Sequence, residues 1–326
     1  MNVNDMVLKL LSEENDYISG ETAANTIGVS RNAVWKAVKA LEAEGHTIES
    51  LHSKGYRLAP DSIRLNEHLI ASRLNTVRLG RHLVVLEEVD STNDYAKKLA
   101  PTGAVHGTAV VADRQTAGKG RVGRSFESPG GKGLYVSIIV RPDFKISDAG
   151  LITSMAACAV ANAIEAVCPA EVGIKWVNDL YIGSKKVCGI LTEATLNLEA
   201  RELDHAVIGI GVNVLSAKAE FGADLSSRAT SIEDETGERI SRNVLCAEIL
   251  NKLEEYMTNM KSRVFLDEYR RREILTGNMI TTRVGDKEIT GKAVGIDDNA
   301  GLVINTGQGT ITLHSGEAQL SRIKKD

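Results

Sequence analysis

The sequence predicts a multidomain α+β protein, with an N-terminal winged helix-turn-helix, a central mixed α+β core and a small C-terminal β-barrel. Its 326 residues are more than one hydrophobic core usually organises. The first part shows helical periodicity followed by a hairpin pattern, the middle mixes strand and helix patterns, and the last fifty residues show only short strands between turns. We therefore expect domains at residues 1–62, 63–272 and 273–326.

The winged helix is predicted from the order of its elements. Helical spacing of apolar residues predicts three helices, one that ends near residue 14 and two over residues 20–27 and 31–44. Between the last two, Gly28 can supply the positive φ of a tight turn, and Ser30 is placed as an N-cap. Residues 48–58 then alternate like a hairpin with its tip at 53–55. This order is that of a winged helix-turn-helix.

The third helix is the element expected to enter the major groove of DNA, with the wing on the backbone. Residues 31–41 carry three basic and no acidic side chains, although the net charge of the chain is −4, so a nucleic-acid site has to be a local patch. The predicted DNA contacts are Ser30, Arg31, Asn32, Trp35, Lys36, Lys39 and, on the wing, Lys54. Two alternatives stay open: a helical domain for protein contacts, and a Trp35 that packs under the wing.

Pro60-Asp61-Ser62 marks the expected boundary before the central region. Strand patterns there cover residues 83–86, 108–112, 134–140, 173–176, 187–193 and 206–212, and helical patterns cover 93–99, 147–167 and 244–260. Short loops join many neighbouring strands. The region is therefore predicted to be α+β rather than a doubly wound parallel sheet.

The heptapeptide Gly118-Lys119-Gly120-Arg121-Val122-Gly123-Arg124 interleaves three glycines with three cationic side chains. Backbone N–H groups can approach a ligand closely there, and the composition suits a phosphate or carboxylate. A P-loop opens a helix, whereas this segment leads into a strand, so a P-loop is rejected. A merely flexible polar loop is the alternative. We expect the loop to be mobile unless a ligand orders it, because it has little to pack against.

Two further clusters carry polar side chains. Lys175-Trp176-Val177-Asn178-Asp179-Leu180, followed by Lys185, Lys186 and Gly189, is predicted to form a strand, a polar turn and a strand. Its lysines and carboxylate could hold a metal-bound triphosphate, and a solvated hairpin is the alternative. Asp90-Ser91-Thr92-Asn93 fits either an N-cap or a reader of a polar ligand head. The string at 209–211 lacks the third glycine of a dinucleotide motif and is assigned no role.

These motifs resemble those of the bacterial biotin protein ligases, in particular the bifunctional class that is also the biotin operon repressor. The resemblance covers essentially the whole chain and rests on residues 90–93, Gln115 with 118–124, 175–180, Lys186 and 189–191. It implies that ATP converts biotin to biotinyl-5′-AMP, and that the biotin then passes to a lysine of a biotin carboxyl carrier protein. It also implies operator DNA as a partner and a ligand-promoted homodimer.

The resemblance also implies roles for individual residues. Biotin would contact Ser91, Thr92, Asn93, Gln115, Lys119, Gly120, Arg121 and Lys186, of which Arg121 and Lys186 are the expected catalytic cations. Lys175, Asn178, Asp179 and Phe126 would serve the nucleotide, with Mg²⁺ near Asp179. The family commonly has arginine at 119, tryptophan at 126 and proline at 177, where this chain has lysine, phenylalanine and valine.

The remaining sequence features exclude other classes. The four cysteines form no CxxC pair and have no histidine at zinc-ligand spacing, so we expect reduced thiols and no structural metal. The N-terminus lacks a signal peptide, and the apolar run at 151–167 is too short to span a bilayer, which predicts a cytoplasmic protein without membrane contact. The last fifty residues suit an SH3-like barrel with no catalytic role. A non-catalytic biotin sensor and a lipoate-type acyl-protein ligase stay as alternatives.

Overall fold

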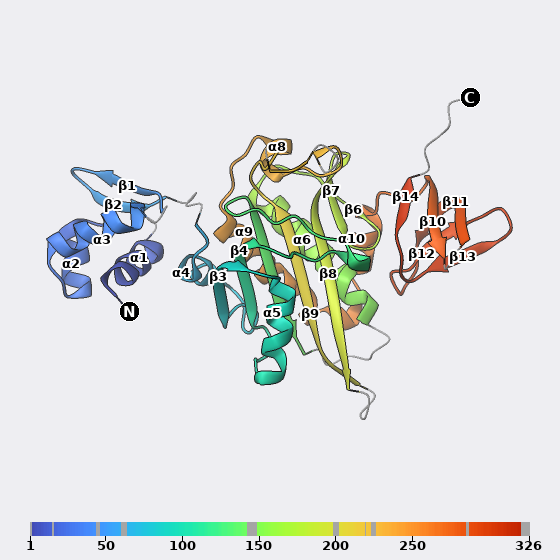
Figure 1. Cartoon of the computed structure of the whole chain (residues 1–326), viewed down its shortest axis with the longest axis horizontal. Coiled ribbons are helices and arrows are strands. Elements are labelled where there is room, and N and C mark those ends of the chain that lie inside the picture. Colours follow the sequence, from blue (N-terminus) through green and yellow to red (C-terminus); the bar gives the residue numbers. More distant parts are fainter. Residues whose placement is uncertain are drawn as a thin grey trace.

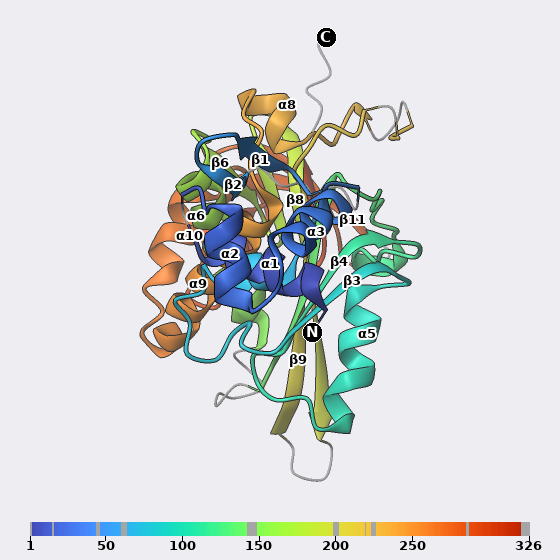
Figure 2. The same cartoon turned by 90° about the vertical axis from the view of Figure 1, so that its left-hand side faces the viewer.

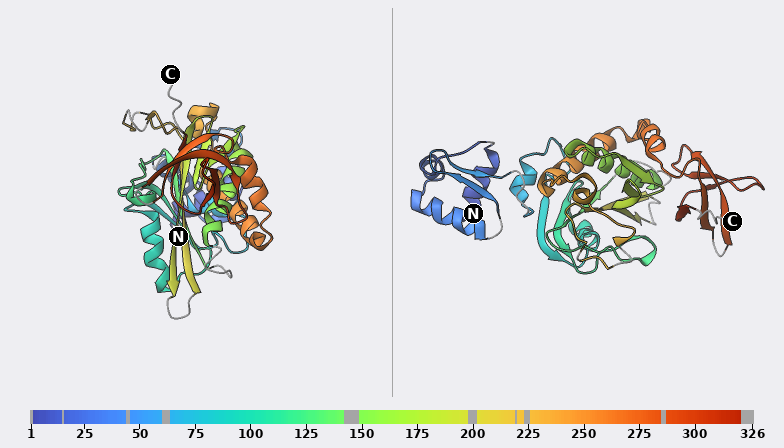
Figure 3. Two further views of the ribbon diagram at one scale, coloured as in Figure 1. Left: turned by 90° about the vertical axis from the view of Figure 1, so that its right-hand side faces the viewer. Right: turned by 90° about the horizontal axis from the view of Figure 1, so that it is seen from above.

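The computed structural model describes residues 2–14, 16–43, 46–59, 64–141, 149–197, 202–218, 220–222, 226–284 and 287–320. They form three parts in a row: a small helical domain, a central sheet covered by helices, and a small all-β domain (Figure 1). The view from above shows the same arrangement (Figure 3). The first and last parts therefore lie on opposite sides of the central one.

The first part is the predicted winged helix-turn-helix, whose three helices stand in front of the central part in Figure 2. Its elements are α1 (Val3–Glu13), α2 (Gly20–Ile27), α3 (Arg31–Ala43) and the antiparallel hairpin of β1 (Ile48–Leu51) and β2 (Gly55–Leu58). The turn is built as expected, with a φ of +74° at Gly28 and a hydrogen bond of 3.2 Å from the Ala33 N–H to Ser30 Oγ. The predicted boundary at 60–62 lies outside the described residues.

The central part is built on a seven-stranded sheet, with the order β3-β4-β5-β9-β8-β7-β6. The strands are β3 (Leu83–Val89), β4 (Ala109–Gln115), β5 (Gly133–Val140), β6 (Val172–Lys175), β7 (Asp179–Ile182), β8 (Lys185–Asn197) and β9 (Glu202–Asn213). Only β3 and β4 are parallel; the other neighbours are antiparallel. The mixed α+β class is thus confirmed, and all six predicted strands are present. The four-residue β7 was not predicted.

Helices cover both faces of this sheet. Because side chains alternate along a strand, Val110 and Val207 pack toward α5 (Thr92–Leu99), whereas Ala109 and Ile208 belong to the main core on the other face. That face is covered by α6 (Ala149–Val167), α9 (Arg242–Thr258) and α10 (Phe265–Arg272). The three predicted helices are confirmed, although residues 147 and 148 lie outside the described residues. Sequence patterns missed α10 and the short helices α4 (Glu67–Ala71) and α8 (Ile232–Thr236).

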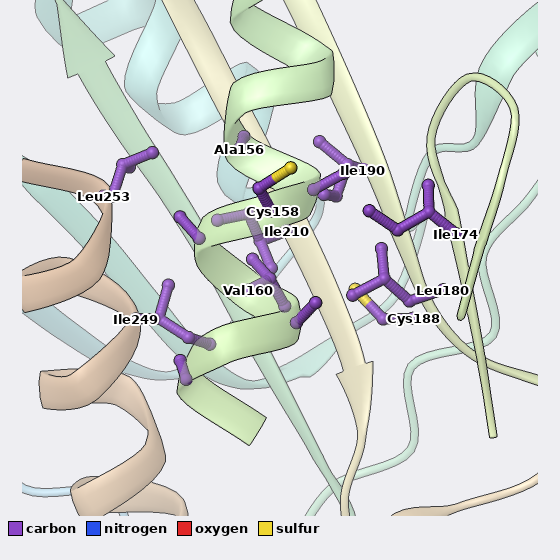
Figure 4. Packing of buried hydrophobic residues seen from close by; sticks show 14 of the residues in the cluster. Ala156, Cys158, Val160, Ile174, Leu180, Cys188, Ile190, Ile210, Ile249 and Leu253 are labelled. Atoms are coloured by element: carbon purple, nitrogen blue, oxygen red, sulfur yellow. The ribbon is translucent and has the colours of Figure 1, made fainter. Parts of the chain in front are cut away.

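The helix α6 is the central core element. By length and composition its residues 150–167 could cross a membrane, which corrects the expectation that this run is too short, but 67% of the stretch is buried inside the protein. Figure 4 shows Cys158 and Val160 of α6 among Ile190 and Ile210 of the sheet and Ile249 of α9. All four cysteines are buried free thiols. This helix is therefore accounted for by core packing.

The last part is a five-stranded antiparallel sheet of order β13-β12-β11-β10-β14, consistent with the predicted SH3-like barrel. Its strands are β10 (Met279–Val284), β11 (Lys287–Ile296), β12 (Leu302–Asn305), β13 (Thr310–Leu313) and β14 (Ala318–Leu320). Its apolar side chains, Ile280 and Leu302 among them, continue the main core, and Trp176 Nε1 donates to the Ala300 carbonyl at 2.9 Å. The predicted turn at 285–286 lies outside the described residues.

Candidate functional site

A pocket lies on the α5 face of the central sheet, where the predicted motifs meet. It is lined by Ser91, Thr92, Asn93, Gln115, Lys119, Gly120, Arg121, Phe126, Asn178, Lys186, Gly189, Ile190, Leu191, Gly209, Ile210 and Gly211. The cavity measures about 50 Å³, whereas ligand pockets usually hold about 300 Å³ or more. A ligand of the size of biotin therefore requires the loop at 118–126 or the Phe126 ring to move.

One end of the pocket is a buried polar network at the start of α5. Ser91 is the N-cap of α5, which is one of the two roles predicted for residues 90–93, and its Oγ accepts from the Asp94 N–H at 3.4 Å. Thr92 donates to Gln115 Oε1 from its N–H at 2.8 Å and from its hydroxyl at 3.1 Å. Ser137, which no motif indicated, donates to Thr92 Oγ1 at 2.7 Å. Such a network fixes the direction of each donor and acceptor, which suits the recognition of a small polar head group.

The pocket also carries three cations, each of which contacts an oxygen of another element. Lys186 Nζ is 2.7 Å from Asp179 Oδ1, and Lys119 Nζ is 2.6 Å from Asp94 Oδ2. Burial alone would raise the pKa of Asp94, but hydrogen bonds from lysines, that of Lys119 first, outweigh it and hold the pKa below its usual value. Arg121 Nη1 donates to Asn178 Oδ1 at 3.1 Å. An anion in this pocket would therefore exchange partners with these groups.

Two of the residues predicted for the nucleotide side stand apart. Neither Lys175 nor Asp179 lines the pocket. Asp179 reaches it only through its ion pair with Lys186. Lys175 lies at the end of β6, where its charge acts on Glu317 of the C-terminal part. Of the lysines and arginines predicted to serve the substrates, Arg121 and Lys186 therefore line one pocket, and Lys175 lies outside it.

Glycines of the paired strands β8 and β9 leave space for two side chains of the pocket. A Cβ atom on Gly209 would lie 2.1 Å from Asn93 Oδ1, and one on Gly211 would lie 2.7 Å from Phe126 Cε1. Gly211 is also the cross-strand partner of Gly189, whose Cβ atom would lie 3.3 Å from the same ring. The Phe126 ring therefore rests on backbone rather than on side chains. The weak signal at 209–211 was a site feature, although not a dinucleotide motif.

The glycine-rich loop is folded on itself and on the C-terminal part. The Gly120 N–H donates to the Arg124 carbonyl at 2.7 Å and the Phe126 N–H to the Gly118 carbonyl at 2.8 Å, so these donors are used within the loop. Arg124 makes two hydrogen bonds to Glu317, of 2.9 and 2.6 Å, and Arg121 donates to the Gly316 carbonyl at 3.0 Å. The expectation that the loop has little to pack against is wrong, because the C-terminal part supplies two of its partners, Gly316 and Glu317.

The predicted DNA-reading face is exposed. Residues 30–32, Lys36, Lys39 and Lys54 are exposed, and Trp35 is 48% exposed, so it does not pack under the wing. On the wing, Lys54 Nζ lies 5.8 Å and the Arg57 guanidinium 4.7 Å from the centre of the Tyr17 ring. The face thus offers exposed cations and an aromatic side chain from α3 together with the cations of the wing, although Lys39 is paired with Glu42 and Arg57 with Glu49, each at 2.7 Å.

No three histidine, cysteine, aspartate or glutamate side chains converge as metal ligands within the described ranges. The carboxylates of Asp94 and Asp179, which lie next to the pocket, are each already paired with a lysine. A divalent ion would need most of its ligands from elsewhere, such as the phosphates of a nucleotide.

Comparison with known proteins agrees with this geometry. The sequence model of the Biotin/lipoate A/B protein ligase family matches residues 85–213, that of an HTH domain residues 3–57, and that of the Biotin protein ligase C terminal domain residues 276–321. The bifunctional ligase/repressor BirA of Bacillus subtilis is 36% identical over 321 residues, which cover 96% of this chain and 97% of that protein. The chain belongs to the bifunctional biotin ligase/repressor family.

Other relatives extend this similarity. BirA of Escherichia coli is 29% identical over 93% of this chain and 94% of its own length. Among solved structures, a biotin protein ligase from Aquifex aeolicus in complex with biotin and ATP is 31% identical, with a TM-score of 0.63. That match covers 74% of this chain and 99% of the Aquifex chain. The family therefore accounts for both the ligase core and the DNA-binding domain.

Proposed function

We propose that this chain is an ATP-dependent biotin protein ligase and a biotin-responsive transcriptional repressor. One observation carries the proposal: the buried polar network around Thr92 and Gln115 and the cations Arg121 and Lys186 line one pocket, on a chain whose third helix exposes a basic face. The three domains that we propose are 1–62, 63–272 and 273–326, and each family match falls within one of them.

Different residues of the pocket bind different parts of biotin and ATP. Ser91, Thr92 and Gln115, with Asn93 behind them, bind the ureido head of biotin. Arg121 and Lys186, flanked by Lys119 and Gly120, hold its carboxylate against the α-phosphate of ATP, while Phe126 and Asn178 serve the nucleotide. This assignment is supported by the contacts of the two sets: Thr92 and Gln115 bond each other at the start of α5, whereas Arg121 and Lys186 contact Asn178 and Asp179 around the turn before β7. It predicts that biotin lies along β8 and β9, over the glycines whose lack of a side chain leaves space above the strands.

The reaction proceeds in two half-reactions. A carboxylate oxygen of biotin attacks the α-phosphorus of ATP, the bond to pyrophosphate breaks, and biotinyl-5′-AMP forms. The ε-amine of a carrier-protein lysine then attacks the activated carbonyl carbon, AMP leaves with the bonding electrons, and the amine loses a proton. The first step brings two anions together, so preorganised cations lower its barrier most. Mg²⁺ that accompanies ATP would neutralise phosphate charge, and the Asp179 carboxylate would help to hold it; Lys175 acts through the charge that it places near this side.

The partners follow from the two activities. A biotin carboxyl carrier protein supplies the acceptor lysine, and operator DNA binds the face of α3 and the wing. One short basic helix discriminates DNA sequences weakly, so repression requires a ligand-promoted homodimer on a two-fold operator. Four buried free thiols support a reducing compartment, and we propose the cytoplasm.

The decisive experiment is to mix the protein with biotin and ATP and to look for a bound adenylate by native mass spectrometry. Biotinyl-5′-AMP on the wild type, together with biotin-dependent ATP–pyrophosphate exchange, is the expected result. Biotin bound without adenylate would favour the non-catalytic sensor. An adenylate that forms from lipoate in preference to biotin would favour the lipoate-type ligase.

A further inference from the structure

The short helix α4 joins the DNA-binding domain to the ligase core. Two neighbouring residues of α4 belong to different cores: Leu69 packs against the core of the winged helix, and the fully buried Ile70 belongs to the core of the ligase. The helix also packs on α1 on one side and on α9 on the other. A displacement of α4 therefore changes the position of the DNA-binding domain relative to the ligase.

Side chains from one face of α9 hold the backbone of the segment that contains α4. Asn243, Asn251 and Glu254 are 8 and 3 residues apart, a spacing that places them on the same side of a helix. Asn243 accepts from the Asn66 N–H at 2.8 Å and donates to the Arg64 carbonyl at 2.9 Å. Asn251 makes the same pair of bonds, to the Asn75 N–H at 2.8 Å and the Arg73 carbonyl at 3.1 Å. Glu254 accepts from the N–H groups of residues 77–79.

The residue beside Asn243 contacts the segment that follows the glycine-rich loop. Arg242 is 2% exposed and bonds Asp113 Oδ1 at 2.7 Å and the Gly133 carbonyl at 2.8 Å. Asp113 Oδ2 in turn accepts from the Gly131 N–H at 2.9 Å, where the glycine-rich segment returns to β5. A buried guanidinium is strongly destabilised without its carboxylate partner. Arg242 must therefore follow Asp113 whenever the end of the loop segment shifts.

We propose that the first turn of α9, Arg242 with Asn243, couples the pocket to the DNA-binding domain within a single copy of the chain. The movement by which the loop admits a ligand shifts the Gly131–Asp113 contact. Arg242 passes this shift to the helix turn, and Asn243 passes it to residues 64–66, where Asn66 caps α4. Close packing transmits such a shift because the interior cannot absorb it in voids. The inference rests on the proposed function and adds a route that does not depend on dimerisation.

Hydrogen–deuterium exchange on the wild-type chain, with and without biotin plus ATP, tests the coupling and the proposed function separately. We expect slower exchange both in the loop segment at 118–131 and in residues 64–79. Protection of the loop with no change at 64–79 would overturn the coupling and leave the ligase assignment intact. No protection in either segment would count against both.

Matched variants locate the coupling on α9. Asn243→Ala and Asn251→Ala each remove one pair of bonds to the same backbone segment, but only Asn243 adjoins Arg242. With Asn243→Ala we expect the loop to remain protected by the ligand, while the ligand-dependent gain in operator affinity falls about tenfold, within the usual range of allosteric coupling. Asn251→Ala should retain that gain. Equal losses in the two variants would mean that α9 only holds the segment in place, and the coupling would be refuted.

Discussion

Replacing Lys186 by alanine should slow adenylate formation by about two orders of magnitude and slow transfer from ready-made adenylate far less. The Lys186 side chain lines the pocket, and its charge matters most while the carboxylate and the α-phosphate approach. Removing one preorganised group that stabilises developing charge typically costs about 3 kcal/mol in the transition state, which corresponds to about 150-fold in rate. The anhydride that reacts in the second step carries one negative charge fewer at the reacting centre.

The structure adds a second part to this expectation. Because Lys186 Nζ lies 2.7 Å from Asp179 Oδ1, the alanine variant also leaves this carboxylate without its cation. Lys186→Arg keeps a cation beside Asp179 and should therefore form adenylate several-fold faster than Lys186→Ala, since a preorganised charge contributes about 3 kcal/mol in the transition state. A Lys186→Arg variant no faster than Lys186→Ala would mean that a positive charge at this position is not what the first step requires.

The two half-reactions are measured separately. Biotin-dependent ATP–pyrophosphate exchange reports adenylate formation, and labelling of a carrier protein by supplied biotinyl-5′-AMP reports transfer. Lys185→Ala is the matched control, because Lys185 is the neighbouring lysine on β8 and does not line the pocket. Equal losses of both half-reactions in Lys186→Ala would refute the reasoning and reduce Lys186 to a ligand-binding role.

Four further outcomes are expected. Arg121→Gly should release adenylate faster and label lysines indiscriminately, and retention as tight as in the wild type would contradict the role of Arg121. Gly211→Ala places a Cβ atom 2.7 Å from Phe126, so calorimetry should show a free energy of unfolding lower by about 1–3 kcal/mol; unchanged stability would mean that the ring moves freely. Glu317→Gln should speed adenylate release less than about fivefold, since pairs as exposed as Arg124–Glu317 contribute at most about 1 kcal/mol. The hydrogen bond from Arg124 lowers the pKa of Glu317, so the ion pair should persist at neutral pH and be lost only as acid protonates the carboxylate. If neither Glu317→Gln nor acid changes the rate of adenylate release, the Arg124–Glu317 pair does not hold the loop over the adenylate. Removing residues 1–62 should abolish operator binding in a mobility-shift assay while adenylate still forms, and DNA binding by the truncated chain would place the DNA site elsewhere.

The helices and strands predicted from the sequence are those long enough to show a clear period of apolar residues. The winged helix was predicted nearly to the residue because three amphipathic helices, Gly28 and Ser30 each specify one feature of it locally. The strand β7 and the helix α4 have only four and five residues, too few for a pattern of period 2 or 3.6 to be distinguished from chance. Their positions are set by tertiary contacts, such as those of Leu69 and Ile70 with two different cores.

Site residues were predicted where the residue type itself indicates a chemical role. They were missed where the role depends on which residues lie next to them in the folded chain. Arg121, Gln115 and Lys186 carry groups that suit an anion or a polar head, and the structure brings them to one pocket. Gly211 matters only because it pairs with Gly189 under the Phe126 ring. Neither this register nor the contact of Arg124 with Glu317, 193 residues away, can be read from spacing along the chain.

The contacts of the loop also change how ligand binding should be understood. Lys119, Arg121, Arg124 and Lys186 are bonded, respectively, to oxygens of α5, the turn before β7, the C-terminal part and β7 itself. Binding of an anionic adenylate is therefore an exchange of partners rather than the capture of a charge by unpaired cations. Part of its electrostatic gain is offset by the bonds that it displaces, and a displaced bond frees its oxygen to move. Those oxygens belong to elements on several sides of the loop. Ligand binding therefore changes contacts of these elements even where the elements themselves do not touch the ligand.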